Sequence, residues 1–245
     1  MLGWILGFSI LGSLGVIAGT ATFMLIPASL RKTLVPCLVS YATGTLLGAA
    51  FLGMIPAALA QAPAARVMAA VLAGMILFFV LEKLVLWRHC HDDSCPTHGR
   101  AAPLILIGDA FHNFVDGIVI AAAFMTSVPL GIATGLAVIA HEVPQEIGDF
   151  AILLNSGYGR SKALLLNGLS AAATLPGAVI AYFWLQQVGG AVPYILAISA
   201  ASFIYIATAD LIPGLHQQTR PGQSLRQFML LFAGIVTIVL VRLGH

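Results

Sequence analysis

Eight runs of apolar residues constrain this chain more than any other feature of its sequence. A membrane-spanning helix needs about 20 consecutive, predominantly apolar residues. Runs of this length are predicted at 3–26, 34–59, 66–87, 103–126, 129–155, 163–186, 193–215 and 225–243. Charged residues make up only 8% of the chain, against about 25% in soluble domains. We therefore expect an all-α polytopic membrane protein, with eight transmembrane helices in a single domain over residues 1–245.

The positions of lysine and arginine predict which ends of the helices face the cytoplasm. Arg66 and Arg242 lie on one side, and the other nine lie at the odd-numbered connections. Those nine are Arg31, Lys32, Lys83, Arg88, Arg100, Arg160, Lys162, Arg220 and Arg226. Because short cytoplasmic loops are enriched in lysine and arginine, we expect the odd-numbered connections inside and both termini outside.

Polar residues interrupt the fourth and fifth helices, between Asp109 and Asp149. The set is Asp109, His112, Asn113 and Asp116, followed by His141, Glu142, Gln145, Glu146 and Asp149. It holds five of the nine carboxylates in the chain. An aspartate at the centre of a membrane helix costs about 2.5–3.5 kcal/mol on insertion scales. These groups must therefore face protein, water or a cation.

Helical periodicity places the polar residues of each helix on one face. At about 100° per residue, those of the fourth helix cover about 100° of arc and those of the fifth about 140°. Only Thr126–Pro129 joins the two helices, so we expect a tight antiparallel hairpin whose polar faces meet. Imidazole, carboxylate and amide donors without thiolate suit Zn²⁺, Fe²⁺ or Mn²⁺ and argue against Cu(I).

An isolated intramembrane histidine or aspartate has a simpler explanation, an interhelical hydrogen bond or a buried ion pair. No lysine or arginine lies in the middle of a predicted span to form such a pair, which favours a cation site. Candidate ligands are His112, Asp116, His141, Asn113, Glu142 and Gln145. Candidates elsewhere on the path are Glu146 and Asp149 (ligands, gating partners or proton acceptors) and Asp109 and Asp210 (entrance or exit).

The connection 88–101 is unusually rich in metal-binding residue types. It contains His89, Cys90, His91, Cys95 and His98. Their spacing matches no closed zinc-finger pattern, so two interpretations stay open: a cytoplasmic metal contact, or a solvated polar loop. With Cys37, the cysteines number three, an odd count that does not suggest a disulfide framework.

Two sequence motifs resemble those of a known protein family. The sequences HNFVDG at 112–117 and HEVPQEIGD at 141–149 resemble the paired signatures of the ZIP (Zrt/Irt-like) metal transporters. The branch that they resemble most carries HEVPHEIGD as its second motif. The expected layout of eight helices, outside termini and a histidine-bearing loop between helices three and four is also similar to that family.

This resemblance implies movement of a divalent metal, most often zinc, toward the cytosol between helices four and five. His112, Asp116, His141 and Gln145 would form a primary site, with Asn113 and Glu142 in an adjoining one. It also implies a homodimer, a 3+2+3 helix arrangement with an inverted repeat, and alternating access of one helix group against another. Zn²⁺ is the expected substrate, with Fe²⁺, Mn²⁺ and Cd²⁺ as further candidates. We expect no enzymatic activity, organic cofactor or nucleic-acid partner.

Three positions depart from the family pattern. Gln145 stands where histidine or glutamate is usual, Gly53 where relatives often carry histidine, and Thr174 where some bacterial members place a glutamate. Fewer charged ligands lead us to expect one principal metal site.

Two rival functions remain at this point. His141-Glu142-Val143-Pro144-Gln145 is similar to the HExxH motif, in which two histidines bind zinc and the glutamate is the general base. An intramembrane zinc metalloprotease is therefore the alternative, although glutamine replaces its second histidine. A metal-sensing scaffold without flux is the other. The absence of a histidine-rich outer domain leads us to expect a bacterial inner (plasma) membrane.

Overall fold

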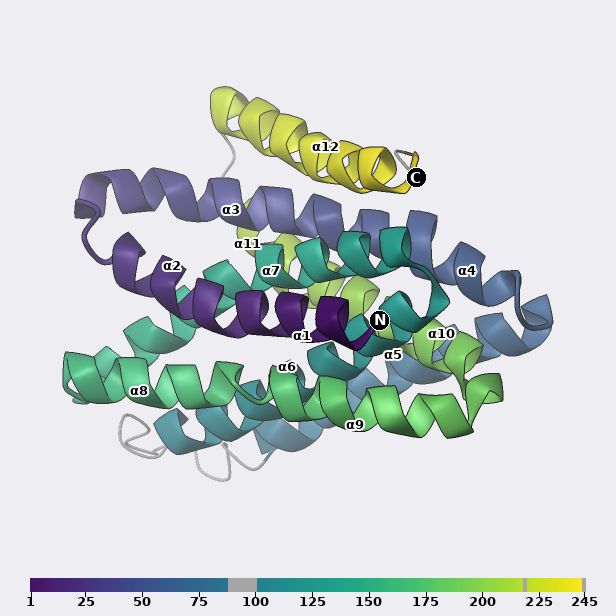
Figure 1. Ribbon diagram of the computed structural model, residues 1–245. Helices are drawn as coiled ribbons and strands as arrows, with labels where there is room; N and C mark the ends of the chain where they lie inside the picture. The colour runs from purple at the N-terminus through teal and green to yellow at the C-terminus, as the bar shows by residue number, and fades with distance from the viewer. Residues whose placement is uncertain (88–100, 218–219, 244–245) are drawn as a thin grey trace.

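The computed structural model describes residues 1–87, 101–217 and 220–243, and is built from helices throughout this part of the chain (Figure 1). The first half contains α1 (Leu2–Ile10), η1 (Leu11–Gly15), α2 (Val16–Phe23), α3 (Ala28–Gly48), η2 (Ala49–Met54), α4 (Ile55–Leu59), α5 (Ala64–Trp87) and α6 (Ala101–Thr126). The second contains α7 (Val128–Asn155), α8 (Arg160–Ala171), α9 (Thr174–Gln187), η3 (Gly189–Ala191), α10 (Val192–Tyr205), η4 (Ile206–Leu211), α11 (Ile212–His216) and α12 (Pro221–Leu243).

These elements join into the eight predicted spans. Within the described residues, seven helical stretches are long and apolar enough to cross a membrane. The eighth span is α7, a 28-residue helix that carries Glu142, Glu146 and Asp149. The prediction of an all-α polytopic membrane protein is therefore confirmed, and the span with the most acidic residues lies among apolar neighbours.

The packing partners of the spans reveal the repeat. The second span packs along the eighth (α3 on α12), and the seventh packs along the third (α10 on α5). Likewise the fourth packs on the sixth (α6 on α9), and the fifth packs on the first (α7 on α2). If the first three spans are exchanged with the last three, and the fourth with the fifth, the pair of spans two and eight becomes the pair of spans seven and three. The pair of spans four and six likewise becomes the pair of spans five and one. A 3+2+3 inverted repeat requires this correspondence.

Spans two and seven are also interrupted at corresponding places. Each contains a π-helical turn, η2 or η4, directly followed by an Ile-Pro pair, Ile55-Pro56 or Ile212-Pro213. Proline lacks a backbone N–H and disturbs the hydrogen bonds of the preceding turn. Matching interruptions in the two halves of a transporter-like fold point to the region between them as the functional site.

The fold depends on close backbone contact at two crossings. A Cβ on Gly117 would overlap the carbonyl oxygen of Thr174, and one on Gly177 would overlap that of Phe114, so α6 and α9 meet backbone to backbone. A Cβ on Gly44 of α3 would similarly overlap the Leu231 carbonyl of α12. Glycines of this kind permit tight helix packing in membranes, where van der Waals contact drives association.

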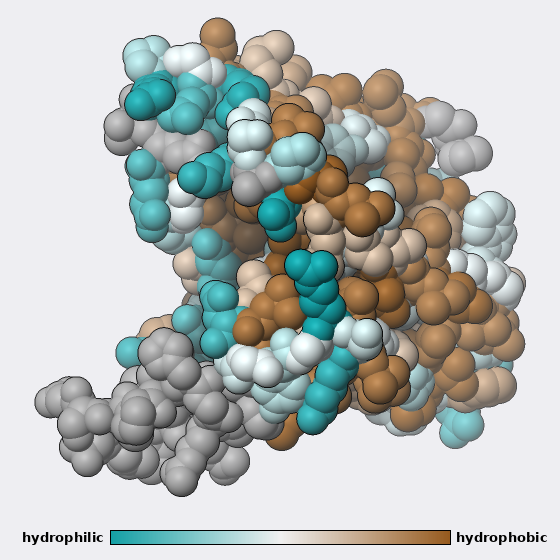
Figure 2. Space-filling model, turned by 90° about the vertical axis from the view of Figure 1, so that its left-hand side faces the viewer, coloured by the Kyte–Doolittle hydropathy of each residue, from teal (hydrophilic) through white to brown (hydrophobic). Residues whose placement is uncertain are grey.

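Both termini lie at the end of the bundle that also carries the turns after α4, α6 and α9 (Figure 1). Figure 2 looks onto the opposite end, where hydrophilic residues gather beside an apolar flank. Large apolar side chains are also exposed on α5 and α12, among them Leu72, Ile76, Phe228 and Phe232. A polar end beside an apolar flank is expected of a protein in a bilayer.

We predict that Gly117→Ala destabilises the protein by about 1–3 kcal/mol, because the new methyl group forces α6 away from α9. Gly108→Ala is the matched control, since nothing lies within 4 Å of a Cβ at that position on the same helix. Thermal unfolding in detergent measures both variants. Equal unfolding temperatures would contradict the close crossing.

Candidate metal centre

The α6–α7 hairpin brings the two polar faces together. Ser127 alone separates the helices, and its side chain accepts a hydrogen bond from the Leu130 backbone N–H at 3.3 Å, which caps the start of α7. Pro129 lies in the first helical turn, where its missing N–H costs nothing. The predicted hairpin is thus present, with its turn at one residue rather than a short loop.

Four predicted residues converge between these helices. The imidazole Nε2 atoms of His112 and His141 are 3.1 Å apart. Glu142 Oε1 lies 3.3 Å from the first and 3.4 Å from the second, and Asp116 Oδ2 lies 3.3 Å from His141 Nε2. One ligand atom from each of these four side chains lies within 4.8 Å of the others.

The histidine orientation suits metal binding. His141 Nδ1 lies 3.0 Å from the carbonyl oxygen of Ala137, and because a carbonyl can only accept, Nδ1 must carry the proton. In the neutral ring the Nε2 lone pair is then directed toward His112 and the carboxylates. A backbone carbonyl that holds the second imidazole nitrogen in this way fixes the tautomer at metal sites.

The carboxylates of this group are deeply buried and lack donors. Asp116 is 0% exposed and Glu142 is 2% exposed. Among the described residues, neither oxygen of either carboxylate has a hydrogen-bond partner. Buried polar groups are normally paired, and an unpaired buried charge is costly. An excess of buried acceptors around two imidazole nitrogens is the environment that a divalent cation would satisfy.

A second group adjoins the first through a shared residue. Oxygens of Asp109, Glu142 and Glu146 also lie within 4.8 Å of one another. Both Glu146 oxygens and Asp109 Oδ2 lack hydrogen-bond partners among the described residues. Glu142 therefore belongs to both groups, whereas the family resemblance placed it only in the adjoining site.

The two predicted amide ligands bind Asp109 in this structure. Asn113 Nδ2 donates to Asp109 Oδ1 at 3.2 Å, and Gln145 Nε2 donates to the same oxygen at 3.1 Å. Thr174 Oγ1 donates to Asn113 Oδ1 at 3.1 Å, so the amide of Asn113 is held from both ends. Gln145 thus contacts the second group, not the histidines with which the resemblance grouped it.

The remaining predicted residues lie outside the two groups. Asp149 is half-buried further along α7, and Asp210 is exposed within the π-helical turn η4. His89, Cys90, His91, Cys95 and His98 fall outside the described residues, and the structure does not bear on them.

Two contacting residues had no signal in the sequence. Phe203, fully buried on α10, meets the His141 ring at 5.8 Å between centroids with the planes at 63°. Asn167 on α8 donates from Nδ2 to the backbone oxygen of Glu146 at 3.0 Å. Phe203 lies in an apolar run like any other in the chain. Asn167 is a single polar residue on the sixth span, and no motif marks it.

Comparisons with known proteins agree with this geometry. The family model described as ZIP zinc transporter matches residues 87–242. Zinc transporter ZIP13 of Pongo abelii is 33% identical over 96% of this chain and 78% of its own length. Zinc transporter SLC39A7 of Homo sapiens is 29% identical over 86% of this chain and 64% of its own. Zinc transporter zipt-7.2 of Caenorhabditis elegans is 39% identical over 57% of this chain and 31% of its own.

The motif-bearing hairpin, the repeated helix arrangement and these matches lead to one conclusion: this chain belongs to the ZIP zinc transporter family.

Proposed function

We propose that this protein transports a divalent transition metal, foremost Zn²⁺, across a membrane toward the cytoplasm, by way of the site between α6 and α7. The observation that carries the proposal is the buried group of His112, Asp116, His141 and Glu142, whose carboxylates lack donors among the described residues. Nitrogen and oxygen ligands without thiolate suit Zn²⁺, with Fe²⁺, Mn²⁺ and Cd²⁺ as further substrates. The relatives named as zinc transporters support zinc.

The shared carboxylate supplies a route between the two groups. An ion held by the two imidazoles exchanges its hydration shell for nitrogen and oxygen ligands at mid-membrane. Glu142 contacts this group and the Asp109–Glu146 group alike, so it can keep one bond to the ion while the other ligands change. Such a step avoids leaving a bare divalent charge in a low-dielectric interior.

We further propose one principal metal site, with the carboxylate group of Asp109, Glu142 and Glu146 as a stepping point. That second group has no imidazole. Its neighbours Gln145 and Thr174 are neutral, at positions where the family pattern has histidine or glutamate (Gln145) or, in some bacterial members, glutamate (Thr174).

The topology proposal follows the charge distribution. Odd-numbered connections, including the histidine- and cysteine-containing segment 88–101, face the cytoplasm, and both termini face outside. The common end occupied by both termini in Figure 1 is compatible with either orientation, and the lysine and arginine count selects this one. We also propose a homodimer in a bacterial inner membrane; the relatives compared above are eukaryotic.

The intramembrane metalloprotease is the weaker reading. Its zinc would require a ligand one turn after His141, and Gln145 at that position donates its amide to Asp109. We therefore propose a transporter without enzymatic activity. Proteoliposomes that take up zinc without cleaving added protein substrates would separate transport from proteolysis and from a flux-free scaffold.

We predict that His141→Ala lowers zinc uptake into proteoliposomes by more than about tenfold, because even the loss of a supporting neighbour of a metal ligand costs 10–100-fold. His112→Ala should behave alike. His216→Ala is the matched control, since this histidine is exposed on α11 and belongs to neither group. Normal uptake by correctly inserted His141→Ala would place the metal path elsewhere.

Metal counting tests single occupancy. Purified protein should retain about one tightly held zinc ion per chain, and His141→Ala should lose it. Glu146→Gln should keep the ion while slowing uptake, because only the stepping point is altered. Two fully occupied zinc sites in crystals measured at the zinc absorption edge would refute the single-site proposal.

Topology is tested with reporter fusions. Alkaline phosphatase fused after His245 should be active, because that enzyme folds only outside the cytoplasm, whereas a fusion within 157–159 should be inactive. Fluorescence from green fluorescent protein fused to the C-terminus would overturn the proposed orientation.

A further inference from the structure

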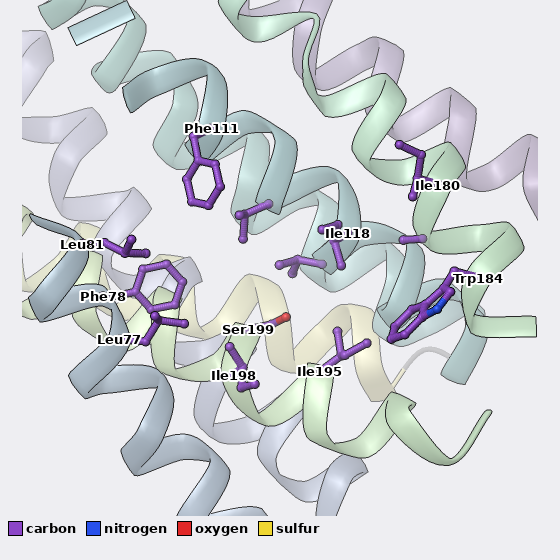
Figure 3. A pocket seen from close by; sticks show the side chains of 13 residues that line it. Leu77, Phe78, Leu81, Phe111, Ile118, Ile180, Trp184, Ile195, Ile198 and Ser199 are labelled. Atoms are coloured by element: carbon purple, nitrogen blue, oxygen red, sulfur yellow. The ribbon is translucent and has the colours of Figure 1, made fainter. Parts of the chain in front are cut away.

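An apolar groove lies on the side of α6 away from the metal-binding groups. Its cavity is about 340 Å³ and is bounded by α5, α6, α9 and α10 (Figure 3). Among the described residues that line it, Ser199 is the only one that is not an apolar type. Side chains that define its length in Figure 3 include Leu77, Phe111, Ile118, Trp184 and Ile195.

The groove is a seam between two tightly packed helix pairs. On one side α6 and α9 touch through Gly117 and Gly177. On the other, a Cβ on Gly74 of α5 would meet the Cβ of Ala201 on α10 at 2.7 Å. Each pair is close-packed internally, and the space between the pairs remains unfilled by protein.

The edges of the groove face the lipid. Leu77, Phe111, Ile180 and Trp184 are 46%, 54%, 57% and 51% exposed. In a membrane-spanning chain, large apolar side chains on the flank of the bundle contact hydrocarbon. The groove can therefore be entered sideways from the bilayer.

We propose that this groove binds one acyl chain of a membrane phospholipid. Water is a poor occupant, because a buried water needs two to four polar partners, and the lining supplies little beyond the Ser199 hydroxyl. An empty groove would forfeit dispersion contacts along its walls. A hydrocarbon chain restores those contacts at no desolvation cost, and the volume lies within the usual range of about 300–1,000 Å³ for ligand pockets.

Trp184 suggests how the lipid is anchored. It lies one turn before the end of α9 at Gln187, at the end of the bundle where the turn to α10 leaves the span (Figure 1). Tryptophan is enriched at the level of lipid headgroups, where its ring is apolar and its N–H can donate. The chain would run from Trp184 along the groove toward Phe111, with the ester region beside the indole.

Trp4 offers a matched reference for the test. It is 50% exposed, against 51% for Trp184, and it lies near the start of α1 at the same end of the bundle (Figure 1). It stacks on Phe124 and does not line the groove. The two indoles thus have similar exposure and belong to helix ends on the same side of the bundle, and they differ in that only Trp184 lines the groove.

The experiment compares two single-tryptophan proteins in bilayers of phosphatidylcholine with brominated acyl chains, which quench nearby indoles. One protein keeps Trp184 and the other keeps Trp4, with the remaining tryptophans replaced by phenylalanine. We expect Trp184 to be quenched roughly twofold more strongly, because a bound chain occupies the groove in a larger fraction of molecules than passing lipid would. Equal quenching would mean ordinary surrounding lipid only, and weaker quenching of Trp184 would mean that protein covers the groove; either result overturns the proposal.

A filled groove provides the second arm. Ile118→Phe with Ile195→Phe in the Trp184 protein should reduce its quenching to the level of Trp4, because both side chains project into the groove (Figure 3). Leu240→Phe, on the exposed face of α12, should leave it unchanged. Undiminished quenching in the filled and folded variant would also refute the site. Neither measurement involves metal, so the outcome is independent of the proposed transport.

Discussion

The structure depends on how carboxylates are kept in the interior of an apolar bundle. Asp116 and Glu142 are buried, have no hydrogen-bond donors among the described residues, and lie against two imidazole nitrogens. In such surroundings an unpaired charge costs several kcal/mol or more. A neutral histidine that presents its Nε2 lone pair supplies a ligand and not a countercharge, so a cation shared by the four side chains would balance the carboxylates.

Packing and site geometry are coupled at the crossing of α6 and α9. Gly117 lets α6 approach the Thr174 backbone, and the hydroxyl of that same threonine donates to Asn113, one turn before Gly117. Asn113 in turn donates to Asp109. The close crossing therefore orients the amide that holds a carboxylate of the second group, and a change in helix separation would be felt at the site.

The two sides of α6 have opposite environments. His112 and Asp116 contact α7 residues, whereas Phe111 and Val115 line the apolar groove. One helix thus forms the wall between a polar interior and a surface that faces hydrocarbon. The seam also separates α6 and α9 from α5 and α10, so a deformable lipid chain there would fill space between helix pairs without linking them rigidly.

The sequence by itself determined the spans, the hairpin and the candidate metal-binding residues, because these depend on local properties: the length of apolar runs, the helical period and the chemistry of side chains. The predicted His112, Asp116, His141 and Glu142 do lie together. Tertiary structure alone decided that Glu142 contacts both groups, that Gln145 donates to Asp109, and that Phe203 packs against His141. These details depend on the rotation of each helix and on side-chain rotamers, which are set by close packing between segments far apart in the chain and leave no periodic trace in the sequence.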